Sequence, residues 1–331
     1  MTRSLSSSFW IIGCLALLIL IIGSLSFGAF SFSLSEIWGG IWRKTEYEVV
    51  STILWEMRLP RTLLAALVGA ALSVAGVLSQ TLVRNPLADP YLLGIANGAS
   101  LFAVSGITLG ILLPQWLLAL LGATAAFFLV SLAARQNGLK LSPLALILCG
   151  VTISAIGASL TTLMMLLGDE RALSQILRWL MGSLVGSQWH AIWPLLFSLI
   201  LLLPLLIIHA HKIDQLLLCD DKAQSIGLSL SSERQVVALV ILIFTAFSVA
   251  AAGVIGFLGL LVPHLMRQWF SASHRELIPT AALFGAITCV TVDLLCRVLF
   301  SPIELPISIP MALLTAPILL IQIRRQSNAM Y

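Results

Sequence analysis

Residues 189–208 read WHAIWPLLFSLILLLPLLII, a stretch without Asp, Glu, Lys or Arg. A helix of this length and composition can cross a hydrocarbon core about 30 Å thick. Similar apolar runs recur along the whole chain of 331 residues, of which 59% are hydrophobic and 10% are charged. Soluble domains carry about 25% charged residues. The chain therefore lacks the polar surface that a water-exposed fold needs, and we expect it to lie in lipid.

Apolar runs separated by polar or Gly- and Pro-containing connections predict ten membrane spans. The hydrocarbon core offers no water to the backbone, so spanning segments must be helices or closed barrels. The chain shows no alternating pattern typical of barrel strands. We therefore expect an all-α, polytopic membrane helix bundle that forms a single domain over residues 1–331. The expected spans cover residues 9–30, 62–83, 92–112, 115–134, 143–167, 189–208, 233–251, 254–270, 277–299 and 307–323.

The distribution of basic residues predicts the orientation. With the N-terminus in the cytoplasm, most Lys and Arg residues fall in cytoplasmic connections, and the C-terminus is cytoplasmic too. Arg58, Arg61 and Arg297 are exceptions at the outer ends of expected helices. They could snorkel to lipid headgroups, with Arg297 paired to Asp293 at i,i+4 spacing. Alternatively, they could form a cationic surface that binds an acidic partner.

Two further segments each allow two interpretations. The inner connection DQLLLCDDKAQSIGLSL at 214–230 predicts a short amphipathic helix that ends near Gly227, where we expect a left-handed backbone conformation. Its apolar face would contain Leu218, Ala223 and Ile226, and would lie on the membrane surface or in a groove of a cytosolic partner. The span 143–167 carries small or hydroxyl residues on one face, which suits either close helix packing or a substrate passage. These residues are Gly150, Ser154, Gly157 and Thr161.

The sequence contains no motif that indicates catalysis. It has no GxxxxGK[ST] phosphate loop, no HExxH, no GxSxG and no paired carboxylates within a span. We expect no catalytic residue, no metal ligands and no cofactor. The net charge of +4 is spread singly along the chain and forms no basic stripe for nucleic acid. Asp293 is the one carboxylate well inside an expected span, which disfavours an ion-coupled carrier.

Blocks of sequence spaced along most of the chain resemble a single family. Arg58-Leu59-Pro60-Arg61 is similar to its RLPR signature, and NPLADPYLLG at 85–94 resembles its most distinctive block. GVIGFLGLLVPHLMR at 253–267 resembles the next block, and Asp293, Arg297 and Glu304-Leu305-Pro306 resemble the last. The chain thus resembles the permease subunits of type II ABC importers, which move ferric siderophores, haem and cobalamin.

The resemblance implies a fold, partners and a location. We expect the ten-helix permease fold of that family, in the inner membrane of a bacterium. Two copies of the permease would form a homodimer around the passage. Two separate ATPase subunits would bind from the cytoplasm, and a periplasmic binding protein would deliver the substrate.

The resemblance also assigns roles to particular residues. Acidic groups of the binding protein would face the docking residues Arg58, Arg61 and Arg297. The ATPase-coupling helix would lie at 214–230, where Asp220, Ala223 and Gly227 keep the family's spacing. The translocation path would follow Gly150, Ser154, Gly157 and Thr161, and the inner gate would lie at Ser142, Pro143 and Leu144.

The implied function is that of a transport subunit without its own nucleotide site. It would carry a metal chelate from periplasm to cytoplasm while its partners hydrolyse ATP. The sequence leaves the substrate open among a ferric siderophore, haem, cobalamin and a small oxyanion such as molybdate. The alternatives are an ion-coupled secondary transporter and a membrane scaffold without transport.

Overall fold

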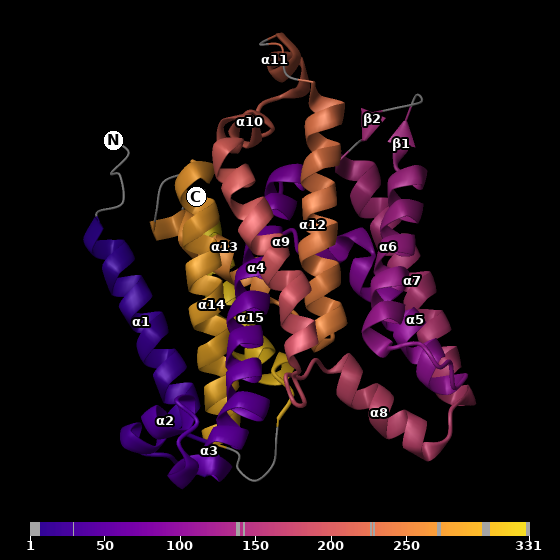
Figure 1. The fold of residues 1–331 in the computed structure, drawn as a ribbon. Coiled ribbons are helices and arrows are strands. Elements are labelled where there is room, and N and C mark those ends of the chain that lie inside the picture. The colour runs from indigo at the N-terminus through magenta and orange to yellow at the C-terminus, as the bar shows by residue number, and fades with distance from the viewer. Residues whose placement is uncertain are drawn as a thin grey trace.

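The computed structural model describes residues 7–28, 30–136, 140–141, 143–225, 227, 229–269, 273–299 and 305–328. Its helices gather into one elongated bundle (Figure 1). The longer helices are α1 (Ser7–Ser26), α4 (Leu59–Val83), α6 (Gln115–Ala133), α7 (Pro143–Leu167), α9 (Trp189–Ile208), α12 (Leu230–Ala252), α14 (His274–Leu299) and α15 (Ser308–Asn328). The shorter helices are α2 (Leu34–Ile41), α3 (Glu48–Thr52), α5 (Ile95–Thr108), α8 (Glu170–Leu180), α10 (Ala210–Gln215), α11 (Asp220–Ser225) and α13 (Leu258–Trp269). Two-residue strands β1 (Arg135–Gln136) and β2 (Lys140–Leu141) pair antiparallel.

The expected all-α class is confirmed, whereas the expected count of ten spans is not. Among the described residues, seven helices are long and apolar enough to cross a membrane. They are Ser8–Ser26, Glu48–Val83, Gln115–Ala133, Pro143–Leu167, Trp189–Ile208, Leu230–Ala252 and His274–Leu299. The helix α5 and the segment Ser308–Ile318 of α15 are apolar but shorter, and α13 has 12 residues. A helix nevertheless lies in each segment that the sequence predicted to span.

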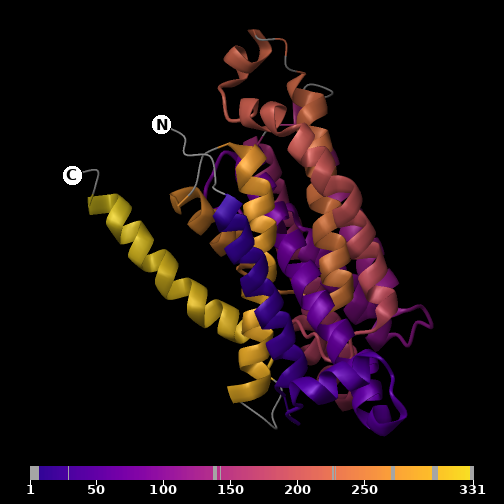
Figure 2. The ribbon, with the colours of Figure 1, turned by 60° about the vertical axis from the view of Figure 1, so that its left-hand side comes forward.

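The bundle has two distinct ends (Figure 1). At the first, the α11 end, lie α10, α11, the β1–β2 hairpin and the start of α1. At the opposite end, the α8 end, lie α2, α3 and α8. The helix α15 leans away from the rest of the bundle (Figure 2) and exposes Leu313 and Leu314.

The core of the bundle is built around α4, which contacts α14, α12, α13 and α9. Glycines allow its backbone to approach two neighbours closely. A Cβ added at Gly69 would lie 2.2 Å from the carbonyl oxygen of Gly285 on α14, and one at Gly76 would lie 1.8 Å from that of Gly259 on α13. Helices in lipid associate largely through such packing, because lipid tails are as apolar as the helices themselves.

The helix that contains α4 begins earlier than the sequence predicted. Helical backbone runs continuously over Glu48–Val83, through α3, a π-helical turn at Ile53–Arg58 and α4. Arg58 and Arg61 therefore lie inside a helix and not at its end, which corrects the expected span of 62–83. Pro60 has no backbone N–H to donate and usually marks a helix start. Here the wider π turn precedes it, and such turns are a common way to absorb an irregularity within a helix.

Packing at Gly76 predicts a large effect of a single methyl group. We expect Gly76→Ala to lower the thermal midpoint of the purified protein, because overpacking of this kind costs about 1–3 kcal/mol or more. Gly256→Ala is the matched control, since a Cβ there meets no atom within 4 Å. Tryptophan-fluorescence melting in detergent measures both variants. Equal midpoints for the two would contradict the backbone contact between α4 and α13.

Candidate functional site

A buried ion cluster joins α4 and α14 at the α8 end. Asp293, which is 1% exposed, lies between two arginines. Arg61 Nε is 2.9 Å from Asp293 Oδ1, and Arg297 Nε is 3.1 Å from Asp293 Oδ2. The Asp293–Arg297 pair was predicted from its i,i+4 spacing and is confirmed. The contribution of Arg61 was not predicted, because it depends on how α4 packs against α14.

The third arginine binds the end of α1. Arg58 donates hydrogen bonds to the carbonyl groups of Leu25, Ser26 and Phe30, and its guanidinium lies 4.3 Å from the ring centroid of Phe32. The last carbonyls of a helix lack intrahelical partners and carry partial negative charge, so a cation stabilises them. Arg297 contacts the same region through the hydroxyl and carbonyl groups of Ser24. The arginines therefore fasten α1 to α4 and α14.

Arg58, Arg61 and Arg297 are each less than a tenth exposed, so snorkelling into lipid headgroups does not describe them. All three line one cavity of 280 Å³ at the α8 end, together with the exposed side chain of Glu56. The three guanidinium groups exceed the two carboxylates Asp293 and Glu56 in charge. The cavity gives an acidic partner a route to the arginines. Docking remains a prediction for all three.

The small-residue face of α7 packs against the rest of this chain. A Cβ added at Gly150 would lie 1.9 Å from the carbonyl oxygen of Leu92, and Gly157 faces Asn97. Thr161 is buried and donates to the carbonyl of Gly157 at 2.8 Å, while Ser154 is half-buried. This placement favours the packing interpretation. A role of the four residues in lining a passage stays a prediction.

The predicted inner gate lies where β2 leads into α7. Ser142 falls outside the described residues. Pro143 is the first residue of α7 and is half-buried, and the side chain of Leu144 is 65% exposed. They belong to the start of α7, which lies beside β2 at the α11 end (Figure 1). Their position agrees with a gate at this end of the bundle, but the gating role itself stays a prediction.

The predicted coupling segment, residues 214–230, contains one complete short helix, α11, and begins with the last two residues of α10. Asp220, the first residue of α11, accepts from Arg84 at 2.6 Å and from Arg234 at 2.7 Å. Arg84 follows α4 directly and also donates to the carbonyl of Leu216 at 2.8 Å. Partial burial raises the pKa of Asp220, but hydrogen bonds from Arg234 and Arg84 outweigh it and hold that pKa below its usual range. Neither arginine was predicted, because both lie in other segments.

The remaining residues of the coupling segment face in different directions. Ala223 is fully buried in the core of this chain, so it does not belong to an exposed groove-filling face. The side chain of Leu218, which was expected on the same face, is 40% exposed, and that of its neighbour Leu217 is 43% exposed. Ile226 lies outside the described residues. Gly227 adopts φ +85°, which confirms the left-handed conformation predicted for it as a helix stop.

The arrangement defines a class of protein. Seven of the described helices are long and apolar enough to cross a membrane, a cavity lined by charged residues lies at one end of the bundle, and a polar segment is bonded to the helix ends at the other. This is the architecture of a multi-pass integral membrane protein, and comparisons with known proteins narrow the class.

A model described as the FecCD transport family matches residues 16–325. The Fe(3+) dicitrate transport system permease protein FecD of Escherichia coli is 42% identical over 268 residues, which cover 80% of this chain and 83% of the relative. The hemin transport system permease protein HmuU of Yersinia pestis is 38% identical and covers 94% of this chain and 93% of the relative. A solved structure described as an inward-facing metal-chelate type ABC transporter matches with a TM-score of 0.87 and 30% identity, covering 97% of this chain and 100% of that one.

The chain belongs to the FecCD transport family. Its relatives in this family are permease components of transport systems and not enzymes themselves.

The ion cluster predicts unequal effects of neutralising its members. Asp293→Asn would leave two buried arginines without their carboxylate, which typically costs about 3–5 kcal/mol. Arg61→Gln would leave Asp293 paired with Arg297, so we expect a smaller loss of thermal stability. Melting of the purified proteins tests this order, with exposed Arg171→Gln on α8 as the control. A larger loss for Arg61→Gln than for Asp293→Asn would contradict the shared carboxylate.

Proposed function

We propose that the chain is the permease subunit of an ATP-driven importer that carries a metal chelate across the inner membrane of a bacterium. The observation that supports this most strongly is the match to the FecCD transport family over residues 16–325. Relatives named for ferric dicitrate and hemin transport indicate the substrate class. A ferric siderophore, ferric citrate or haem comes first, followed by cobalamin and a small oxyanion such as molybdate.

The proposed subunit forms one permease domain with ten spans and acts as a homodimer with two ATPase subunits and a periplasmic binding protein. Exposed apolar residues on α7 and α15 offer surfaces for a second copy or for lipid. The exposed side of α7 carries three hydroxyl residues, Thr152, Ser159 and Thr162. Each of them donates a hydrogen bond to the backbone carbonyl four residues earlier. This side of α7 suits the passage between copies better than the buried stripe on the opposite side.

The proposed orientation places the α11 end in the cytoplasm, with both termini on that side. Arg84 and Arg234 bond α11, and Arg267 bonds the last turn of α4, so three cations gather at this end, as the positive-inside bias favours. The exposed Leu217 and Leu218 beside α11 offer an apolar contact for the ATPase. Asp220 fixes α11 to α4 and α12, so that a push on α11 would reach the bundle. Gly227 allows the chain to turn back toward α12.

The runner-up is an ion-coupled carrier. Such carriers usually rely on ionisable groups near the middle of the membrane. Asp293 is already neutralised by two arginines, which disfavours a cation-binding role for it.

Transport in reconstituted vesicles tests the proposed function. We expect the complex of the chain with its ATPase and binding-protein partners to accumulate radiolabelled ferric citrate, haemin or cobalamin only with ATP inside the compartment that holds the ATPase. Uptake driven by a proton or sodium gradient without ATP would contradict the proposal and support the carrier.

Docking at the arginine-lined cavity predicts an effect of its exposed carboxylate. Glu56→Lys removes a negative charge that opposes an acidic partner. We expect it to raise the rate of binding-protein association at low salt by roughly two- to fivefold, since rim charges act mainly on association. Exposed Glu46→Lys is the control of equal charge change outside the cavity lining. Slower association of the Glu56→Lys variant, measured by surface plasmon resonance on nanodiscs, would exclude an acidic docking partner.

A further inference from the structure

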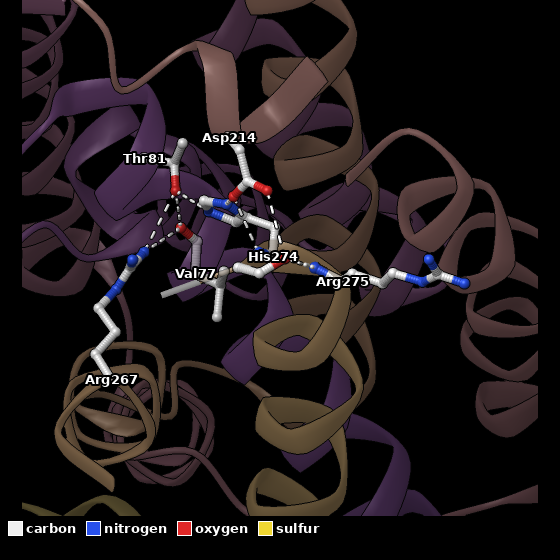
Figure 3. A network of polar contacts seen from close by, with 7 residues as sticks. Val77, Thr81, Asp214, Arg267, His274 and Arg275 are labelled. Atoms are coloured by element: carbon white, nitrogen blue, oxygen red, sulfur yellow. Dashed lines mark hydrogen bonds and ion pairs between the residues drawn. The ribbon is translucent and has the colours of Figure 1, made fainter. Parts of the chain in front are cut away.

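The imidazole of His274 bridges two segments at the α11 end. This residue begins α14 and is fully buried. Its Nε2 lies 2.6 Å from Thr81 Oγ1 in the last turn of α4, and its Nδ1 lies 2.5 Å from Asp214 Oδ1 on α10 (Figure 3). One side chain therefore links α14, α4 and the segment that leads into α11.

Asp214 also caps the start of α14. Its carboxylate accepts the backbone N–H of His274 at 3.0 Å and the hydroxyl of Ser273 at 3.4 Å. The first N–H groups of a helix lack intrahelical acceptors and carry partial positive charge, so a carboxylate is well placed there. Partial burial raises the pKa of Asp214, but the hydrogen bonds from His274 and Ser273 outweigh it and keep that pKa below the usual range. The cap is supplied by a different segment, so α10 cannot move away without uncapping α14.

Arg267, in the last turn of α13, bonds the same last turn of α4. Its Nη2 donates to Thr81 Oγ1 at 3.3 Å and to the carbonyl of Val77 at 3.4 Å (Figure 3). Its Nε donates to Gln80 Oε1 at 3.3 Å. Thr81 in turn donates its hydroxyl hydrogen to the carbonyl of Val77 at 2.9 Å. The last turn of α4 is thus bonded directly by α13 and α14, and α10 is linked to it through His274.

A second, independent link ties the coupling segment to the same helix. Arg84, immediately after α4, binds both the carboxylate of Asp220 and the carbonyl of Leu216. The segment from α10 to α11 is therefore held to the end of α4 on both sides of the connection between these two short helices.

The two helices that receive these links are also joined elsewhere. Their backbones touch at Gly69 and Gly285, and the ion pair between Arg61 and Asp293 joins them at the α8 end. Polar links at both ends and close contact between them restrict sliding or rotation of α4 against α14.

We propose that α4 and α14 form a rigid pair that carries displacement of the α10–α11 segment to the arginine cluster at the α8 end. In this pair His274 is the positioning residue that joins the segment to the two helices. The inference rests on the proposed function, in which the ATPase acts on the α10–α11 segment and the binding protein acts at the arginine-lined cavity. It names the helices through which the ATPase on one side and the binding protein on the other would be coupled.

Hydrogen exchange in nanodiscs tests the route on the chain alone. We expect Thr81→Val and His274→Gln to speed exchange severalfold in α10–α11 and also at the distant turns that contain Arg61 and Asp293. Thr280→Val is the matched control, because Thr280 is equally buried on α14 but bonds only within its own helix. Faster exchange confined to the α11 end would assign His274 a merely local role and overturn the proposal.

A second measurement uses the complete complex in vesicles. In both bridge variants we expect uptake per ATP hydrolysed, and stimulation of the ATPase by loaded binding protein, to fall by about tenfold, within the range of typical allosteric couplings. ATPase co-purification and basal hydrolysis should stay at the level of Thr280→Val. Wild-type stimulation and uptake per ATP in both variants would overturn the proposal. The proposed function is tested separately by the unaltered complex, and it would fail if that complex showed no ATP-driven uptake.

Discussion

The contact between α4 and α14 is the constraint on which the rest of the structure depends. Within lipid, burial of apolar surface gives helices little reason to associate, so shape and polar links must hold them together. At Gly69 and Gly285 the two backbones meet with no room for a side chain on either helix. Once this pair is set, α1, α13 and α9 pack against one or both of its members. The segment α10–α11 is then positioned by the helix ends.

The buried charges follow from the same constraint. A carboxylate in a membrane protein is tolerated when cations neutralise it, and Asp293 has two of them. Removing one partner from a buried ion pair leaves an uncompensated buried charge and is strongly destabilising, although the intact pair need not be more stable than apolar residues of similar volume. The arginines at the α8 end therefore serve the fold first. Any docking role uses side chains that are already held in place.

The two ends of the bundle are built differently for their proposed tasks. The α8 end presents a cavity with excess positive charge, which suits an acidic surface that approaches and leaves. The α11 end presents short helices whose inner residues are fastened by His274, Arg84 and Arg234, while Leu217 and Leu218 remain exposed. In the proposed function, displacement of the exposed side would therefore act on helix ends, because the segment is bonded to them.

Much of this could be predicted from the sequence, because the property concerned is local. Apolar length predicted where helices lie, and α7 and α9 begin and end at the predicted residues. The i,i+4 spacing predicted the Asp293–Arg297 pair, and the position of Gly227 predicted its left-handed backbone. The order of motif blocks predicted the family. Each of these depends on residues close together in the chain, or on a pattern that reads directly along it.

The tertiary structure alone decided which residues meet across helices. Arg61 reaches Asp293, Asp214 caps α14, and Ala223 turns inward only because helices distant in sequence pack at a particular rotation and depth. The early start of the helix before Pro60 likewise depends on a π turn that no apolar pattern reveals. The sequence by itself determined that the chain is a membrane helix bundle of this family. Packing between helices decided which of its polar residues hold the bundle together, because rotation about a helix axis is set by neighbours and not by the chain's own periodicity.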